Sequence, residues 1–175
     1  MAEGAAEHHP LLNWRQAGIG VAALVAGAVL YLLERPLGPV ALTPEGWSLI
    51  EDGGPILGFL GRVLPDILHP FAFAMLTGAL LIPGTLRYGF ACLAWAAVDL
   101  VLEVGQAPPV LAWLEEVLAP WAGQVPGVEL ALAYFRDGVF TVMNVLAVIL
   151  GAGAAWFMLQ ITARRDDLQH VARNS

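Results

Sequence analysis

A small set of acidic, amide and hydroxyl side chains, with one histidine and one arginine, stands out because it lies in or beside long apolar segments. In chain order its members are Asp66, His69, Asp99, Glu103, Gln106, Arg136, Asp137, Thr141 and Asn144. Asp99, Glu103 and Gln106 are spaced at i, i+4 and i+7, which places them on one face of a helix. The residues from Asp137 to Asn144 repeat this spacing. We therefore expect two polar stripes that face each other.

These side chains predict a polar pocket inside an otherwise apolar protein. Burying an unpaired carboxylate costs several kcal/mol, so acids in apolar segments usually face a bundle interior or a water-filled cavity. The catalytic candidates are Asp66, His69, Asp99, Glu103 and Asp137, and the other candidates for the pocket are Gln106, Arg136, Thr141 and Asn144. The alternative is a structural hydrogen-bond network that holds the helices together. Whether the protein is an enzyme stays open at this point.

A divalent metal is an open alternative, although no cofactor is predicted. Asp66, His69 and Glu103 are weak candidate ligands, since carboxylates and an imidazole suit Zn, Mn or Mg. The chain has no His-Glu-x-x-His motif. His69 also precedes Pro70, which predicts either a helix start or a kink at this point.

Composition indicates that lipid surrounds most of the chain. Of its 175 residues, 58% are hydrophobic and 13% are charged, and its mean hydropathy is +0.70, whereas roughly a quarter of the residues in soluble domains are charged. The length suits a single transmembrane domain over residues 1–175. The net charge of -7 and the lack of any Lys argue against nucleic acid as a partner. Cys92 lies in an apolar run and is expected to serve packing alone.

Four segments are long and apolar enough to cross a bilayer, at residues 17–33, 67–86, 88–106 and 138–163. The expected fold is therefore all-α, a polytopic membrane protein with four transmembrane helices. One or two short amphipathic helices should lie at the extracytoplasmic interface, over residues 110–121 and 56–64. They are expected either to cap the polar pocket as a lid or to anchor the chain at the interface.

Helix registers test whether the polar residues meet. A short turn joins the second and third spans, so Asp66 and His69 should lie within one helical turn of Glu103. A longer connection leads to the fourth span, so its register is free. One choice pairs Asp99 with Asn144.

Arginines indicate the orientation, because cytoplasmic ends of membrane proteins are richer in positive charge. The side that holds both termini carries Arg15, Arg87, Arg164, Arg165 and Arg173, and the other side carries Arg35, Arg62 and Arg136. We therefore expect both termini in the cytoplasm. The small residues from Gly151 to Ala155, with Gly151 and Gly153 foremost, predict close helix packing, either within the chain or against a membrane-protein partner.

The polar residues resemble the pattern of the VanZ-like family of small bacterial integral membrane proteins. The matching residues are Asp66 and His69, Glu103-Val104-Gly105-Gln106, Arg136, Asp137 and Asn144, with Ala147 and Gly151 at two glycine positions. The resemblance covers roughly residues 66–156 and implies a bacterial cytoplasmic (inner) membrane and a role in the cell envelope. It does not imply a reaction.

The leading hypothesis is an inner-membrane protein whose extracytoplasmic polar pocket recognises or acts on a lipid-linked or cell-envelope molecule. One alternative is a non-catalytic small subunit that packs against a larger membrane complex. A second alternative is an intramembrane metal-dependent hydrolase.

Overall fold

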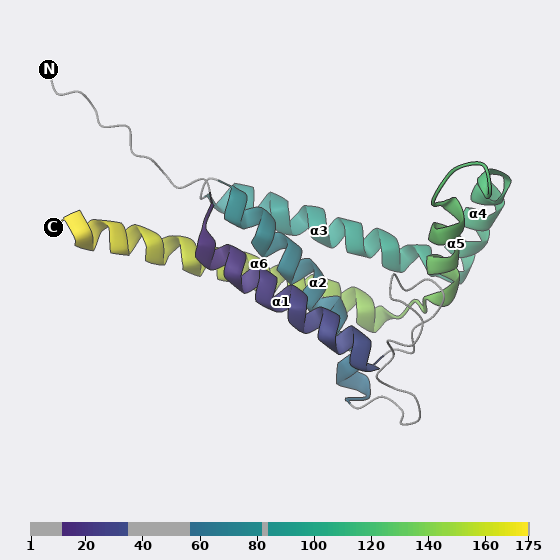
Figure 1. The fold of residues 1–175 in the computed structure, drawn as a ribbon, viewed down its shortest axis with the longest axis horizontal. Helices are drawn as coiled ribbons and strands as arrows, with labels where there is room; N and C mark the ends of the chain where they lie inside the picture. The colour runs from purple at the N-terminus through teal and green to yellow at the C-terminus, as the bar shows by residue number, and fades with distance from the viewer. Residues whose placement is uncertain (1–11, 35–56, 82–83, 175) are drawn as a thin grey trace, which may run out of the picture.

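The computed structural model describes residues 12–34, 57–81 and 84–174, and this part of the chain is helical with no strand. The elements are α1 (Trp14–Glu34), α2 (Phe59–Leu80), α3 (Thr85–Gly105), α4 (Pro108–Leu118), η1 (Ala119–Trp121), α5 (Val128–Asp137) and α6 (Val142–Asn174). The long helices run side by side, and α4 and α5 sit together at one end of them (Figure 1). The start of α1 and the end of α6 lie at the opposite end.

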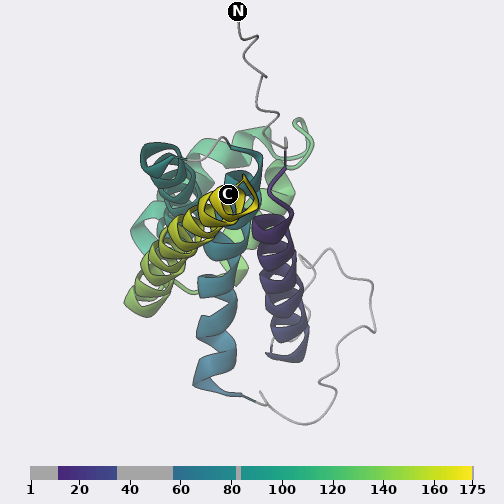
Figure 2. The same ribbon diagram turned by 90° about the vertical axis from the view of Figure 1, so that its left-hand side faces the viewer.

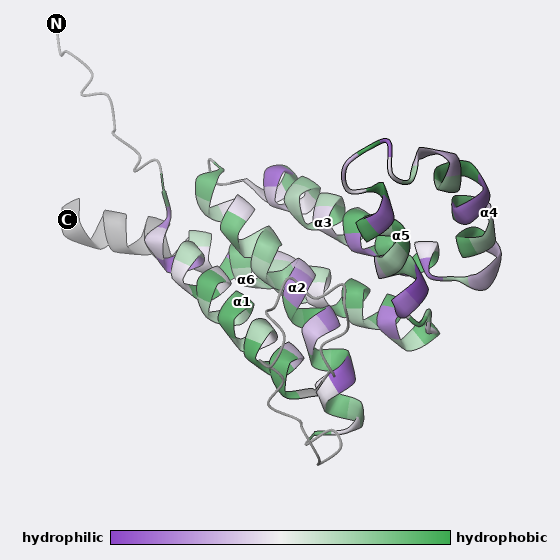
Figure 3. Cartoon of the chain, turned by 45° about the vertical axis from the view of Figure 1, so that its right-hand side comes forward, coloured by the Kyte–Doolittle hydropathy of each residue, from purple (hydrophilic) through white to green (hydrophobic). Residues whose placement is uncertain are grey.

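Four of these helices are long and apolar enough to span a membrane, which confirms the predicted all-α architecture with four spans. Their spanning segments are Trp14–Leu33, Phe59–Leu80, Thr85–Gly105 and Val142–Ala163. Large apolar side chains such as Val25, Phe90 and Leu150 are more than half exposed on these helices. Figure 3 shows that hydrophobic residues predominate along the spans and that hydrophilic residues are more frequent toward α4 and α5. Such a surface suits contact with lipid rather than water.

The second span differs from its predicted bounds of 67–86. It begins at Phe59, so the short amphipathic helix expected over 56–64 is instead the first part of α2, and Ile56 lies outside the described residues. The helix also continues through Pro65 and Pro70, so neither proline ends it. It stops at Leu80 because Leu81 is extended, at φ -90 and ψ 145.

The fourth span begins at Val142 and not at residue 138, which corrects the predicted stripe from Asp137 to Asn144. Asp137 is the last residue of α5, and Gly138 after it is extended at φ -78 and ψ 157. Thr141 then caps α6, because its Oγ1 accepts a hydrogen bond of 3.1 Å from the backbone N–H of Asn144. Asp137 and Asn144 therefore belong to different helices.

Helix α2 is the centre of the bundle, since it packs against α1, α3 and α6. Figure 2 shows α1 beside α2 on one side and α6 crossing it on the other. The core between these helices includes Met75, Tyr88, Val148 and Leu159, which are almost fully buried. Helix α1 meets the other spans chiefly through α2.

Glycines allow α2 and α6 to come close together. A Cβ atom on Gly151 would collide with the carbonyl oxygen of Ile67 and lie 2.9 Å from Cγ of Pro70. Gly78 accommodates the side chain of Leu159 in the same way. In contrast, Gly153 is exposed and has nothing within 4 Å of its Cβ position. Gly151 of the small-residue patch therefore serves packing between α2 and α6 of the same chain, whereas Gly153 does not.

A buried glutamine joins three helices at the end that holds the termini. Nε2 of Gln16 donates hydrogen bonds to Oη of Tyr88 at 3.2 Å and to Oγ1 of Thr162 at 2.9 Å. Gln16 is 0% exposed, so these bonds lie in an apolar surrounding. They tie α1 to α3 and α6, with which it otherwise has little contact.

Replacing Thr162 with valine is expected to destabilise the bundle by about 1 kcal/mol, because the buried amide of Gln16 loses one acceptor while the side-chain volume changes little. The measurement is the free energy of unfolding in detergent micelles, followed by circular dichroism. Thr85→Val is the control, since Thr85 is exposed and its bond to Gln160 is 3.4 Å long. Equal stabilities of the two variants would contradict the prediction.

Candidate functional site

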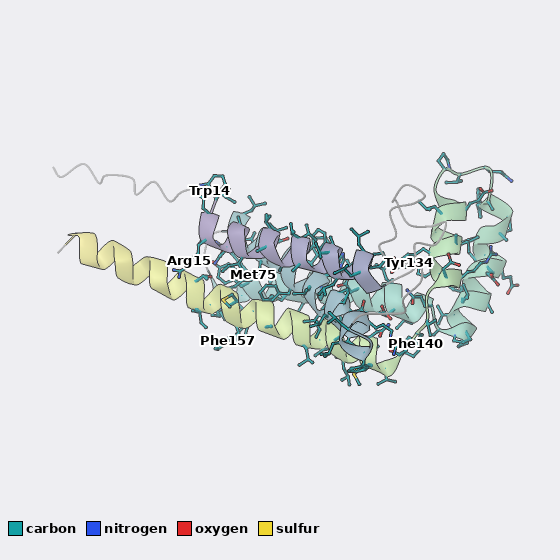
Figure 4. All side chains as sticks on the ribbon, turned by 60° about the horizontal axis from the view of Figure 1, so that its bottom comes forward. Trp14, Arg15, Met75, Tyr134, Phe140 and Phe157 are labelled. Atoms are coloured by element: carbon teal, nitrogen blue, oxygen red, sulfur yellow. The ribbon has the colours of Figure 1, made fainter. Side chains whose placement is uncertain are left out.

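A cavity of about 610 Å³ lies where the spanning helices meet α5. Its walls come from five helices, and the lining residues are Tyr31, Pro65, Asp66, His69, Asp99, Leu102, Glu103, Gly127, Leu130, Ala131, Tyr134, Phe135 and Val148. In Figure 4, Tyr134 marks this end of the bundle, far from Trp14 and Arg15 at the end with the termini. The volume falls within the range of small-molecule binding sites, and the lining mixes apolar walls with a few polar groups.

The central polar pair of this cavity is His69 and Asp99. Nδ1 of His69 lies 2.9 Å from Oδ1 and 3.1 Å from Oδ2 of Asp99. The side chain of Asp99 is 8% exposed and that of His69 is 44% exposed, so the acid lies behind the imidazole. Because a carboxylate accepts hydrogen bonds, Nδ1 is the nitrogen that carries a proton. The other ring nitrogen, Nε2, is therefore left to meet a ligand or water.

Aromatic packing between α2 and α3 fixes the His69 ring. Phe73, one turn further along α2, meets the imidazole edge to face with ring centroids 4.7 Å apart. Trp95 of α3 stacks on Phe73 at 4.5 Å, and its Nε1–H donates to Oγ1 of Thr77 at 2.9 Å. The contacts follow the i, i+4 spacing on both helices, so the pairing of His69 with Asp99 belongs to an extended interface. The predicted register of the second and third spans is consistent with this pairing.

A second polar pair joins α3 to α6. Nδ2 of Asn144 donates to Oε2 of Glu103 at 3.0 Å, and Oγ1 of Thr141 donates to Oδ1 of Asn144 at 2.7 Å. Asn144 thus lies opposite Glu103 and not opposite Asp99, one turn away from the register chosen for span four. The connection from α3 to α6 contains two helices and leaves that register to tertiary packing.

The acids dominate the charge of the cavity lining. Asp66, Asp99 and Glu103 contribute carboxyl groups, and His69 contributes an imidazole. No lysine or arginine is among the lining residues described by the structure. The structure thus brings Asp66, His69, Asp99 and Glu103 to one cavity. Such a wall favours groups that donate hydrogen bonds over anionic groups.

Five of the sequence candidates are not among the described lining residues, and Thr141 and Asn144, which form the pair between α3 and α6, are two of them. Gln106 is buried, and its amide occupies the space beside Gly138 where a side chain would otherwise stand. Arg136 pairs with Glu115 of α4, with Nε and Oε1 2.6 Å apart. Asp137 is exposed at the end of α5. Asp137 lies away from the cavity because the chain breaks between α5 and α6, so Asp137 and Asn144 are not on one face of a single helix.

Helix α5 forms one wall of the cavity and was not predicted from the sequence. Leu130, Ala131, Tyr134 and Phe135 line the cavity from this helix. Phe135 packs on Gly105, where a Cβ atom would lie 2.8 Å from Cδ1 of its ring. The i, i+4 spacing of Leu130 and Tyr134 was the signal that could have revealed an inward face. The amphipathic helix predicted over 110–121 exists as α4 and η1, but its residues are not among the cavity lining.

The described residues provide no ligand set for a metal. Among them, no three His, Cys, Asp or Glu side chains come together in an arrangement that could hold an ion. Asp66, His69 and Glu103 share the cavity without forming such a group. The metal-dependent hydrolase therefore stays a prediction with no geometric support from this part of the chain.

We found no match to this chain among protein-family models, curated proteins or solved structures. The likeness to the VanZ-like family therefore rests on the residues quoted for it, and membership stays a prediction. What the structure itself establishes is an all-helical fold with four candidate transmembrane helices and, at one end, a largely apolar cavity that contains a few polar groups.

Proposed function

We propose that this protein recognises, and has the groups to act on, the polar part of a lipid-linked or cell-envelope molecule that enters the cavity from the membrane. The observation that carries the proposal is the half-exposed His69, held at Nδ1 by the nearly buried Asp99 on the wall of a cavity of about 610 Å³. A histidine that served packing alone would need no such orientation toward open space.

The chemistry available in the cavity is proton exchange and hydrogen bonding. An imidazole oriented by a carboxylate can accept a proton at Nε2 from a bound hydroxyl, amine or water molecule. Recognition, with His69 as a general base or acid, is the chemistry that the pair of His69 and Asp99 supports.

The proposed orientation places both termini in the cytoplasm of a bacterial cell and the cavity at the outer face of its cytoplasmic membrane. Arg15 and Arg87 lie at the starts of α1 and α3, whereas Arg62 and Arg136 lie toward the cavity end. The excess of arginine at the end with the termini, together with the arginines of the C-terminal segment, supports this orientation. Arg35 lies outside the described residues.

The test is retention of molecules from a bacterial envelope extract. Protein reconstituted in nanodiscs made with the extract is purified, and the bound molecules are identified by native mass spectrometry. Wild type is expected to enrich a defined molecule over bulk lipid. In His69→Ala and Asp99→Leu, we expect the enrichment of this molecule to fall about tenfold or more. The reason is that a hydrogen bond to a charged group contributes about 1.5–3 kcal/mol to binding.

Val101→Ala is the matched control, because Val101 lies on the same helix as Asp99 with its side chain 68% exposed. It should keep the enrichment of wild type. Asp99→Asn, which retains an acceptor for Nδ1, should lose less than Asp99→Leu. If His69→Ala folded and retained the same molecule as wild type, the proposal would be wrong.

The non-catalytic subunit is the second candidate, and one observation favours it. Gly153 and Ala154 are exposed on α6 between the large exposed side chains Leu150 and Phe157. Small residues on a lipid-facing surface allow another helix to approach. Co-purification separates the two candidates, because a stable protein at fixed stoichiometry supports the subunit and a retained envelope molecule supports the pocket.

A further inference from the structure

We infer that the ligand is an amphiphile whose hydrocarbon chain lies in a second cavity between α1 and α2, while its uncharged or cationic head group lies in the larger cavity. The inference rests on the proposed function, because it names a ligand class for the same site. The second cavity has a volume of about 230 Å³. Its lining residues are Ala23, Leu24, Gly27, Ala28, Tyr31, Pro65, Leu68 and His69.

The two cavities adjoin each other. Tyr31, Pro65 and His69 line both of them. The phenol and the imidazole thus stand at the junction, where the head group of an amphiphile would join its chain. A molecule held at Nε2 of His69 can extend from this point toward α1 without leaving the protein surface.

The second cavity is suited to a hydrocarbon chain. Apart from the two side chains at the junction, its lining is apolar. Helix α1 contributes the small residues Ala23, Gly27 and Ala28, whereas its outward face carries Val25 and Val29, which are about half exposed. A Cβ atom on Gly27 would lie 3.4 Å from Cβ of Leu68, so α1 and α2 are in close contact at that level. The groove therefore has an apolar floor and walls that a flexible chain can follow.

The side chains that line the larger cavity determine which kind of head group can bind there. Asp66, Asp99 and Glu103 line it, with no arginine or lysine among the described lining residues. Phosphate groups are normally bound by Arg, Lys or clustered backbone N–H groups, whereas carboxylates accept hydrogen bonds. A head group that donates hydrogen bonds through hydroxyl or amino groups matches this wall. Tyr134 and Phe135 add aromatic faces on the side of α5.

The experiment uses photoactivatable probes on the full chain in nanodiscs of saturated phosphatidylcholine. Each probe has a dodecyl chain with a terminal diazirine and carries an amine, a glucoside or a phosphate as its head group. Adducts are located by peptide mass spectrometry. We expect the amine and glucoside probes to label the groove residues Ala23, Leu24, Gly27, Ala28 and Leu68 about tenfold more than the phosphate probe does.

Ala28→Trp should fill the groove and lower this labelling about tenfold. Ala26→Trp is the matched control, because it introduces the same ring on an exposed position of α1 that does not line the groove. It should label as wild type. Circular dichroism of both variants establishes that α1 still forms.

Equal labelling of the groove and of the outward-facing Val21 and Val25 would overturn the inference, because it would indicate general lipid contact alone. A preference for the phosphate probe, or labelling that Ala28→Trp does not reduce, would overturn it as well. If an envelope molecule is retained through His69 but the groove stays unlabelled, this inference fails and the proposed function stands. The opposite result is also informative. If groove labelling depends on the head group but is unchanged in His69→Ala, the groove is a binding site and His69 has no role in the proposed function.

Discussion

Replacing Gly151 with alanine is expected to destabilise the protein by about 1–3 kcal/mol, although alanine is the better helix former. The added methyl group would collide with the backbone carbonyl of Ile67 and approach Pro70, so α2 and α6 would have to move apart. A flexible side chain could move aside, but a helix backbone cannot do so without disturbing its neighbours. The measurement is the free energy of unfolding in mixed micelles, obtained from an SDS titration followed by circular dichroism.

Gly153→Ala provides the control for this prediction. Gly153 is on the same helix, two residues away, and nothing lies within 4 Å of its Cβ position. The substitution should leave stability unchanged or raise it by up to about 1 kcal/mol, the gain in helix propensity. Similar effects of the two substitutions would mean that α2 and α6 do not approach each other at Gly151.

Replacing Asn144 with aspartate is expected to cost about 3 kcal/mol or more, because a carboxylate would replace the donor that lies 3.0 Å from Oε2 of Glu103. Glu103 is 9% exposed, so solvent screens the repulsion weakly. Asn144→Leu, which removes the donor without adding charge, should cost less. The same unfolding titration measures both variants.

A second substitution can restore the pair. Glu103→Gln in the Asn144→Asp background reverses donor and acceptor, so the double variant should recover at least about 1 kcal/mol relative to Asn144→Asp alone. The coupling energy comes from the four proteins of the double-mutant cycle. A coupling near zero would show that Asn144 and Glu103 do not form the bond that joins α3 to α6.

Much of the fold could be predicted from the sequence because membrane spans are a local property. About 20 apolar residues are needed for a helix to cross the hydrocarbon core, and each of the four spans contains such a run. The meeting of α2 and α3 was also predictable. Their connection is so short that the helices must be antiparallel neighbours, which leaves His69 few positions on α3 to face. Asp99 is one of them, 2.9 Å away.

The other half of the site depended on tertiary packing. Asp137 was expected on the fourth span, but the extended Gly138 and the cap at Thr141 separate α5 from α6. Short helices outside the bilayer give a weak signal, since their stability comes from the surface on which they pack. The i, i+4 spacing of Leu130 and Tyr134 indicates an apolar face, but only the packing of α5 shows that this face lines the cavity.

The amino-acid sequence is sufficient to predict an all-helical fold, the four segments that are long and apolar enough to cross a bilayer, and the pairing of the second and third spans, whose residues Asp66, His69 and Glu103 line one cavity. Hydrophobic length and a short turn are sufficient for this, because both act within neighbouring segments. The pairing of Asn144 with Glu103, the place of α5 as one wall of the cavity, and the pairing of Arg136 with Glu115 depend on tertiary packing. These pairings join segments through long connections, so they depend on which surfaces pack best once the spans have formed.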